Sequence, residues 1–278
     1  MEIIKTILNN NHYRYRFQHC DNSEQHIVFL LGALQDIESV NSFSTYFSNK
    51  MNCITIEIPG TGHTEHLEST ISIRDQATML REFLRYLRVS SAHIIGFSYA
   101  TAVAVELCDI WPHVRSMSIC GGVPGIPSSG RLATKKMIAA AMSSPTCFAN
   151  SFTESLTVNN DNIPKNKAII RATVRSIKAM PQERIDVFFE NSVRLLVHTP
   201  SNVDKITAPS TICVGEHDPY VTKETAANFA QQLPNGHLVV IKNADHLVHL
   251  QYPDTVARAM LAQVEAQLIL HKQLATIN

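Results

Sequence analysis

The sequence lacks an excess of charge of either sign. Its 24 lysine and arginine residues are balanced by 24 aspartate and glutamate residues. Proteins that bind a nucleic-acid backbone or an anionic lipid surface use a surplus of positive charge, which this chain does not have. The balance therefore argues against a nucleic-acid-binding function.

Long apolar runs and a cysteine framework are also missing. No apolar stretch reaches the roughly 20 residues that a membrane-spanning helix needs, although apolar residues make up 45% of the chain. The six cysteines are scattered without a C-x-x-C pair, so we expect neither disulfides nor a cysteine metal site. The first residues lack the basic-then-apolar pattern of a signal peptide. We expect a cytoplasmic protein without a membrane span.

Short β-branched and apolar runs recur along the chain and are typical of strands buried on both faces. Amphipathic stretches separate them, and in one of these Ser72 can cap a helix whose apolar face includes Ala77 and Leu80. Alternating strands and helices predict an α/β domain with a mostly parallel central sheet and helices on both faces. The predicted strands are residues 26–31, 53–58, 93–97, 116–120, 210–214 and 238–241.

One stretch, residues 125–207, breaks this alternation. It contains helical segments punctuated by prolines and no convincing strand. We predict a helical cap at 125–207, inserted into a core formed by residues 1–124 and 208–278. The apolar residues of the cap either line a pocket for an acyl chain or pack the cap onto the sheet. The pocket candidates are Met137, Met142, Phe148, Phe152 and Phe189.

A strand followed by a turn of small residues marks the first candidate catalytic residue. The strand at 93–97 runs into Gly96-Phe97-Ser98-Tyr99-Ala100, and the residues that follow are helical in character. A G-x-S-x-A pattern between a strand and a helix predicts a nucleophile elbow, with its serine in a strained backbone conformation. Positions 96 and 100 must be small because they press against neighbouring backbone. We predict Ser98 as the nucleophile.

A serine hydroxyl is a weak nucleophile at neutral pH, so it needs a base that a third group orients. Asp218 and His246 each follow one of the predicted strands. The order Ser98, Asp218, His246 along the chain is the order expected for this arrangement. We predict His246 as the general base and Asp218 as the acid that orients it.

Each of these two partners has a rival nearby. Glu216 lies two residues before Asp218, but a proline follows Asp218 and restricts its loop. His249 lies three residues after His246, where a helix is expected to begin. We favour Asp218 and His246, and both rivals stay open on the sequence alone.

An acyl-transfer site also needs backbone N–H groups directed at the developing oxyanion. Tyr99 follows the nucleophile, and Ala33 follows Gly32 in the loop after the first buried strand, so their N–H groups are the predicted oxyanion hole. The sequence contains neither a complete G-x-G-x-x-G fingerprint nor a helical H-x-x-x-H zinc motif. We therefore expect no cofactor and no metal.

These motifs resemble the α/β-hydrolase superfamily over nearly the whole chain. The resemblance implies the α/β-hydrolase fold, with a Ser-Asp-His triad and no cofactor. The residues that carry it are Gly32-Ala33, Pro59-Gly60-Thr61-Gly62, Gly96 to Ala100, Gly215 with Asp218, and His246.

More narrowly, the chain is similar to a branch that handles 3-hydroxyacyl thioesters. That branch includes hydroxyalkanoyloxy-alkanoate synthases and 3-hydroxyacyl carrier-protein transacylases. The likeness is carried by Leu31-Gly32-Ala33 and by Asp218, Tyr220 and Thr222. The chain departs from it at Tyr99-Ala100, where Trp-Gly is usual, and at His249, where an acidic residue is usual.

The sequence thus predicts a serine enzyme that hydrolyses an acyl ester or thioester, or transfers its acyl group. If the apolar residues of the cap line the pocket, they predict a medium-chain acyl group. The narrower resemblance implies that this is a 3-hydroxyacyl group, carried as a thioester on an acyl carrier protein or coenzyme A. The same residues leave other functions open. These are a non-catalytic small-molecule receptor on the same fold, a cofactor-free haloperoxidase and a carbon–carbon bond hydrolase.

Overall fold

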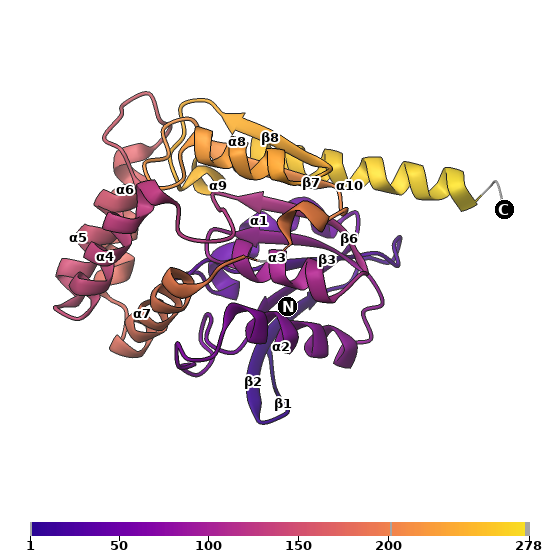
Figure 1. Cartoon of the computed structure of the whole chain (residues 1–278), viewed down its shortest axis with the longest axis horizontal. Helices are drawn as coiled ribbons and strands as arrows, with labels where there is room; N and C mark the ends of the chain where they lie inside the picture. The colour runs from indigo at the N-terminus through magenta and orange to yellow at the C-terminus, as the bar shows by residue number, and fades with distance from the viewer. Residues whose placement is uncertain (1, 201, 276–278) are drawn as a thin grey trace.

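The computed structural model describes residues 2–200 and 202–275, with side chains described as far as residue 267. A twisted sheet lies at the centre of the molecule (Figure 1). The described residues contribute eight strands to it. These are β1 (Ile4–Leu8), β2 (Asn11–Gln18), β3 (His26–Leu30), β4 (Asn52–Glu57), β5 (Ala92–Phe97), β6 (Val114–Cys120), β7 (Ser210–Gly215) and β8 (Gly236–Ile241).

The strands lie in the order β1-β2-β4-β3-β5-β6-β7-β8. Those from β3 to β8 run parallel, and β1 and β2 add an antiparallel hairpin at one edge. The six strands predicted from sequence are confirmed, each within two residues of its expected bounds. The hairpin was not predicted, because its strands are half exposed and polar. Its turn is made by Asn9 and Asn10, both with positive φ.

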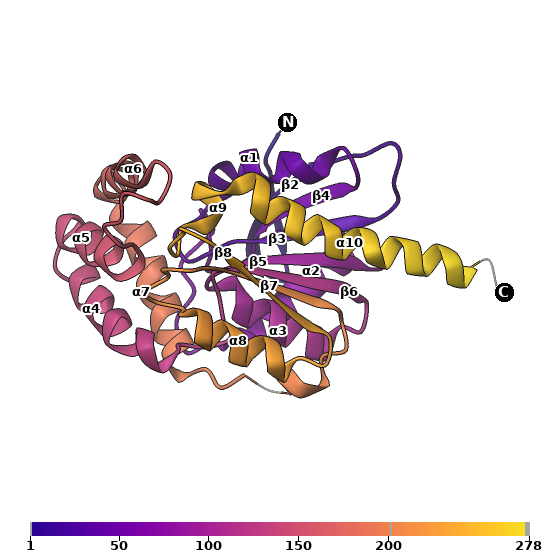
Figure 2. The same cartoon turned by 90° about the horizontal axis from the view of Figure 1, so that it is seen from above.

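Helices cover both faces of the sheet, as predicted (Figure 2). One apolar cluster joins the sheet to α2 (Ile73–Tyr86), α3 (Ala100–Ile110) and α8 (Lys223–Gln232). The other face packs against α1 (Ile37–Ser48) and α10 (Pro253–Ala275). Ser72 caps α2 as expected, since its side chain accepts the N–H of Asp75. Among the described residues no helix is both long enough and apolar enough to cross a membrane.

Four helices stand between β6 and β7 and gather at one end of the sheet (Figures 1 and 2). They are α4 (Arg131–Ala141), α5 (Pro145–Leu156), α6 (Asn166–Lys178) and α7 (Gln182–Val197), and we call them the helical insertion. A small apolar cluster of their own, centred on Phe148 and Phe188, holds them together. The insertion lies over the carboxyl ends of the parallel strands, where open α/β sheets build their sites.

Candidate active site

Ser98 lies in the tight turn between β5 and α3. Its φ is 44°, a left-handed conformation that costs a serine about 1–3 kcal/mol. The Ser98 N–H donates to the carbonyl of Cys120 at 2.9 Å, which helps to hold the turn. A Cβ atom on Gly96 would lie 3.2 Å from Ile119 Cδ1 and 3.4 Å from the carbonyl oxygen of Ala100. The strained, closely packed turn expected at Ser98 is therefore present.

The structure brings Ser98, Asp218 and His246 together from the ends of three different strands. Ser98 Oγ lies 3.1 Å from His246 Nε2. On the other side of the ring, His246 Nδ1 lies 2.8 Å from Asp218 Oδ2. An aspartate that accepts the Nδ1 proton leaves Nε2 free to accept a proton from the serine hydroxyl.

Backbone groups fix the two partners of the serine. Asp218 Oδ1 accepts the N–H groups of Tyr220 at 2.9 Å and Val221 at 2.8 Å, so its other oxygen faces the histidine. The His246 N–H donates to the carbonyl of Leu156 at 3.3 Å, at the end of α5. The loop that carries the histidine is therefore tied to the helical insertion.

The electrostatic surroundings of His246 favour its protonated form. Burial alone lowers the pKa of this histidine, but the charge and hydrogen bond of Asp218, with a smaller effect of Asp245, outweigh burial and raise it above 6.5. An imidazole with a raised pKa accepts a proton more readily. The site can thus take a proton from Ser98 and hold it against Asp218.

The two rival residues lie elsewhere. Glu216 is a third exposed and accepts the N–H of Asn243 at 3.1 Å, without contact to His246. His249 Nε2 lies 3.0 Å from the side-chain nitrogen of Gln35. The alternatives that the sequence left open are therefore separated by geometry, because only Asp218 of the two acids reaches His246.

The serine opens into a half-open and mainly apolar cavity of about 120 Å³. Ser98 and His246 form part of its wall, and both predicted oxyanion residues, Ala33 and Tyr99, lie there too. The helical insertion contributes the opposite wall. Its side chains in the cavity lining include Phe152, Leu156, Phe188, Ser192 and Leu195.

Of the five pocket residues predicted from sequence, only Phe152 lines this cavity. Met137 and Phe148 are buried inside the insertion's own apolar cluster. Phe189 is half-buried outside the lining, and Met142 is 75% exposed at the end of α4. Helical spacing showed that these residues are apolar, but it could not show which face of each helix turns to the serine.

Leu156, Phe188 and Leu195 also line the cavity. They belong to the larger apolar set of residues 125–207 that could line a pocket on the sequence alone, although they are not among the five pocket candidates. Phe188 and Leu195 share a face of α7 with Arg184 and Asn191, at the spacing of successive helical turns. Gln35 and Ser192 were not identified from the sequence as cavity residues, because single polar residues carry no spacing signal.

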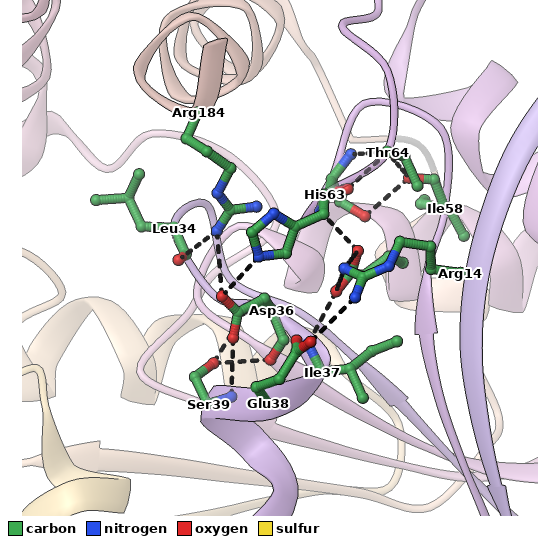
Figure 3. Close-up of polar contacts among 12 residues, drawn as sticks. Arg14, Leu34, Asp36, Ile37, Glu38, Ser39, Ile58, His63, Thr64 and Arg184 are labelled. Atoms are coloured by element: carbon green, nitrogen blue, oxygen red, sulfur yellow. Dashed lines mark hydrogen bonds and ion pairs between the residues drawn. The ribbon is translucent and has the colours of Figure 1, made fainter. Parts of the chain in front are cut away.

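A cluster of charged side chains lies beside the loop that follows β3 (Figure 3). Potential ligand atoms of Asp36, Glu38 and His63 lie within 4.8 Å of one another. However, Arg14 pairs with Glu38 at 3.0 Å, and Arg184 lies 3.7 Å from Asp36. The arginines already compensate the acidic charges, so the cluster acts as an ion-pair network that joins α7 to the start of α1.

Comparison with known proteins gives one consistent answer. A sequence model described as the alpha/beta hydrolase family matches residues 28–259. The (E)-2-((N-methylformamido)methylene)succinate hydrolase of Acinetobacter baylyi is 22% identical over 279 residues, which cover 95% of this chain and 98% of that protein.

Solved structures agree on the fold. MGS-M2, an alpha/beta hydrolase enzyme from a Medee basin deep-sea metagenome library, has a TM-score of 0.85 at 17% identity, with 94% of this chain and 97% of that chain covered. A thermophilic esterase from Thermogutta terrifontis has a TM-score of 0.79 at 16% identity, with 96% and 99% covered. The fold is therefore the α/β-hydrolase fold, as the sequence motifs predicted. The chain belongs to the alpha/beta hydrolase family.

Proposed function

We propose that this protein is a serine hydrolase of the esterase type, which cleaves an ester or thioester through Ser98, His246 and Asp218. The observation that carries the proposal is the chain of contacts from Ser98 Oγ to His246 to Asp218, at 3.1 Å and 2.8 Å. Ser98 faces a half-open cavity whose mainly apolar walls can bury an acyl group. A receptor on the same fold would need the cavity but not the proton relay.

The proposed reaction has two halves. Ser98 Oγ attacks the acyl carbon while His246 Nε2 takes the hydroxyl proton, and the carbonyl oxygen becomes an oxyanion. When the tetrahedral intermediate collapses, the bond to the leaving alcohol or thiol breaks and His246 returns the proton to it. Water, activated by the same histidine, then hydrolyses the acyl-serine. An acceptor alcohol or thiol in place of water would give acyl transfer.

The oxyanion needs hydrogen-bond donors that are already in position. The N–H groups of Ala33 and Tyr99 are the proposed donors, because both residues lie in the cavity wall beside Ser98. Loss of one such donor costs about 2.7–4 kcal/mol of transition-state stabilisation in serine enzymes.

The cavity favours an uncharged acyl group. Its lining contains no lysine or arginine among the described residues, and its aromatic and aliphatic walls suit hydrocarbon. The relative from Acinetobacter baylyi is named for a succinate derivative. We propose that the present enzyme takes a neutral acyl group instead.

The acyl length follows from the size of the cavity. A dry cavity of roughly 150 Å³ accepts one benzene molecule, so the present cavity holds about five carbon atoms. A medium-chain acyl group, such as the 3-hydroxyacyl group of the thioester branch that the sequence resembles, exceeds this volume. It requires either that α5 and α7 move apart or that the end of the acyl chain extends through the open side of the cavity. We propose the medium-chain substrate on that condition, whether as a simple ester or as a carrier-protein or coenzyme A thioester.

Labelling with a fluorophosphonate and turnover of p-nitrophenyl butyrate test the proposal together. We expect the phosphonate to modify Ser98 alone, as read by peptide mass, and Ser98→Ala to lose at least about a thousandfold in kcat with an unchanged melting temperature. Ser90→Ala, an exposed serine on the surface, is the matched control. Labelling of another serine, or substantial turnover by Ser98→Ala, would refute the assignment.

A series of p-nitrophenyl esters from acetate to dodecanoate tests the acyl length. Each additional buried methylene contributes about 0.8 kcal/mol, so kcat/KM should rise by about fourfold per carbon until the cavity is full. A maximum near butyrate or pentanoate indicates the cavity as it stands. A maximum at octanoate or beyond supports the medium-chain substrate, and a maximum at acetate contradicts both.

A further inference from the structure

A short chain of side-chain contacts connects α9 (Val248–Gln251) to the loop that follows β3. Gln35 Oε1 accepts the N–H of Gly32 at 2.7 Å. The other end of the same amide, Gln35 Nε2, lies 3.0 Å from His249 Nε2. The Gln35 N–H also donates to the carbonyl of Gly32 at 3.0 Å, so the loop closes on itself as a tight turn.

The chemistry of the Gln35 amide determines which atom donates and which accepts in each of these contacts. Because Gly32 N–H requires an oxygen, the Gln35 nitrogen must face His249 and donate to it. His249 can accept at Nε2 only when its proton is on Nδ1 and the ring is neutral. Burial, and to a lesser extent the nearby His246, lower the pKa of His249 to about 4, which keeps the ring neutral.

The loop held in this way is the one that carries the proposed oxyanion donor Ala33. The N–H of Ala33 belongs to the peptide that begins at Gly32, so the orientation of Gly32 sets where this N–H points. Gln35 and His249 both line the cavity, as do Gly32 and Ala33. The ring of His249 is itself held in place against Phe97, at a centroid distance of 5.1 Å.

We propose that Gln35 and His249 are positioning residues for the oxyanion hole: His249 orients the Gln35 amide, which in turn anchors the N–H of Gly32, in the peptide immediately before the one that carries the Ala33 N–H. This inference rests on the proposed esterase function of the same site. It also gives His249 a role that differs from that of a general base. Neither residue gives or takes a proton in the reaction, so their effect falls on the transition state, where the oxyanion exists.

Substitutions that remove both contacts, or only the contact with His249, test the proposal. Gln35→Met keeps the length of the side chain and removes both contacts, and His249→Leu removes the acceptor. We expect each to lower kcat for p-nitrophenyl butyrate by about ten- to a hundredfold, less than full loss of an oxyanion donor, with KM changed by less than about threefold. His249→Gln offers an oxygen near the position of Nε2 and should recover at least part of the loss.

Gln231→Met, on the exposed surface of α8, is the matched control and should behave as the wild type. The double variant Gln35→Met with His249→Leu separates a shared role from two independent ones. If the two residues act through the same series of contacts, kcat of the double variant should be no lower than that of the slower single variant. If they act independently, the two fold-losses in kcat should multiply.

Several results would overturn the proposal. Wild-type kcat in Gln35→Met, a rise in KM with unchanged kcat, or multiplied losses in the double variant would each contradict it. Equal losses in His249→Gln and His249→Leu would reduce His249 to a packing residue. Measurements on the wild-type protein distinguish failure of this proposal from failure of the proposed function. If the wild-type protein neither turns over esters nor is labelled at Ser98, the esterase function itself is refuted.

Discussion

The central sheet and the helical insertion are built on different physical principles. Strands β3, β5 and β7 are buried on both faces, and apolar clusters hold the sheet to the helices on either side. The insertion has only a small apolar cluster, and on α6 only Asn166 and Ile177 are buried. The sheet is therefore stabilised by non-directional packing, and the insertion needs another kind of attachment.

That attachment is polar and depends largely on one face of α7. Arg194 is buried and donates to the carbonyls of Ile71, Leu67 and Glu68 at 2.6, 2.7 and 2.8 Å. Asn191 donates to the carbonyl of Gly60 at 2.8 Å. Hydrogen bonds are directional, so they set how the cavity wall faces Ser98. The proposed catalytic residues thus lie on the packed sheet, and the opposite cavity wall lies on an insertion that is attached mainly by polar contacts.

We expect the largest loss of activity from a substitution at the end of a sheet strand, at Asp218. Asp218→Asn should lower kcat by about a thousand- to ten-thousandfold, because an amide stabilises the wrong tautomer of His246. Glu216→Gln is the matched control and should change kcat by less than about threefold, since Glu216 does not contact the histidine. Comparable losses in the two variants would move the orienting role away from Asp218. Steady-state kinetics with p-nitrophenyl butyrate decide between them.

The pH profile gives the next largest effect. In the proposed mechanism the neutral form of His246 is the base, and its raised pKa should place the midpoint of the kcat/KM rise above pH 6.5. Below that midpoint the rate should fall by about tenfold per pH unit. The pairing with Asp218 has the opposite effect on folding: its stabilisation is complete below the unfolded-state pKa and is lost as pH rises through the folded pKa.

The residual activity of Asp218→Asn provides the control for that profile. Without the carboxylate, burial dominates and should move the midpoint to lower pH. A midpoint that stays in place would show that a group other than His246 is titrating.

The six parallel strands and the turn at Ser98 could be predicted from the sequence for a physical reason. A strand buried on both faces must be mostly apolar, and the turn at Ser98 must have small residues on both sides, so composition and spacing reveal both. Which side of α7 turns toward the cavity could not be predicted in this way. Phe188 and Phe189 are neighbours with the same chemistry, and only the contacts of Arg184, Asn191 and Arg194 with distant carbonyls determine which one reaches the cavity.

Arg194→Met would break the attachment of the insertion. It removes the donor of three partly buried carbonyls, so we expect the free energy of unfolding to fall by about 3 kcal/mol. KM for p-nitrophenyl butyrate should rise several-fold, while the phosphonate still labels Ser98, because the sheet keeps the serine in place. Arg175→Met, on the exposed side of α6, is the control for loss of one positive charge. Equal destabilisation by both variants would show that net charge, not anchoring, matters.

The smallest effect tests which apolar residues of the insertion face the substrate. Phe152 lies in the cavity wall, with its ring 5.8 Å from that of Phe188, and Met142 is exposed on the outer surface. Phe152→Ala removes apolar contact with a short acyl group and adds room for a longer one. We expect kcat/KM to fall a few-fold for butyrate and the optimum of the ester series to move to longer chains. Met142→Ala should leave the whole series within about twofold of the wild type, because its side chain contacts solvent. If Met142→Ala shifted the optimum and Phe152→Ala did not, α4 rather than α5 would form the acyl-binding wall, and the insertion would have to bind substrate in a different arrangement.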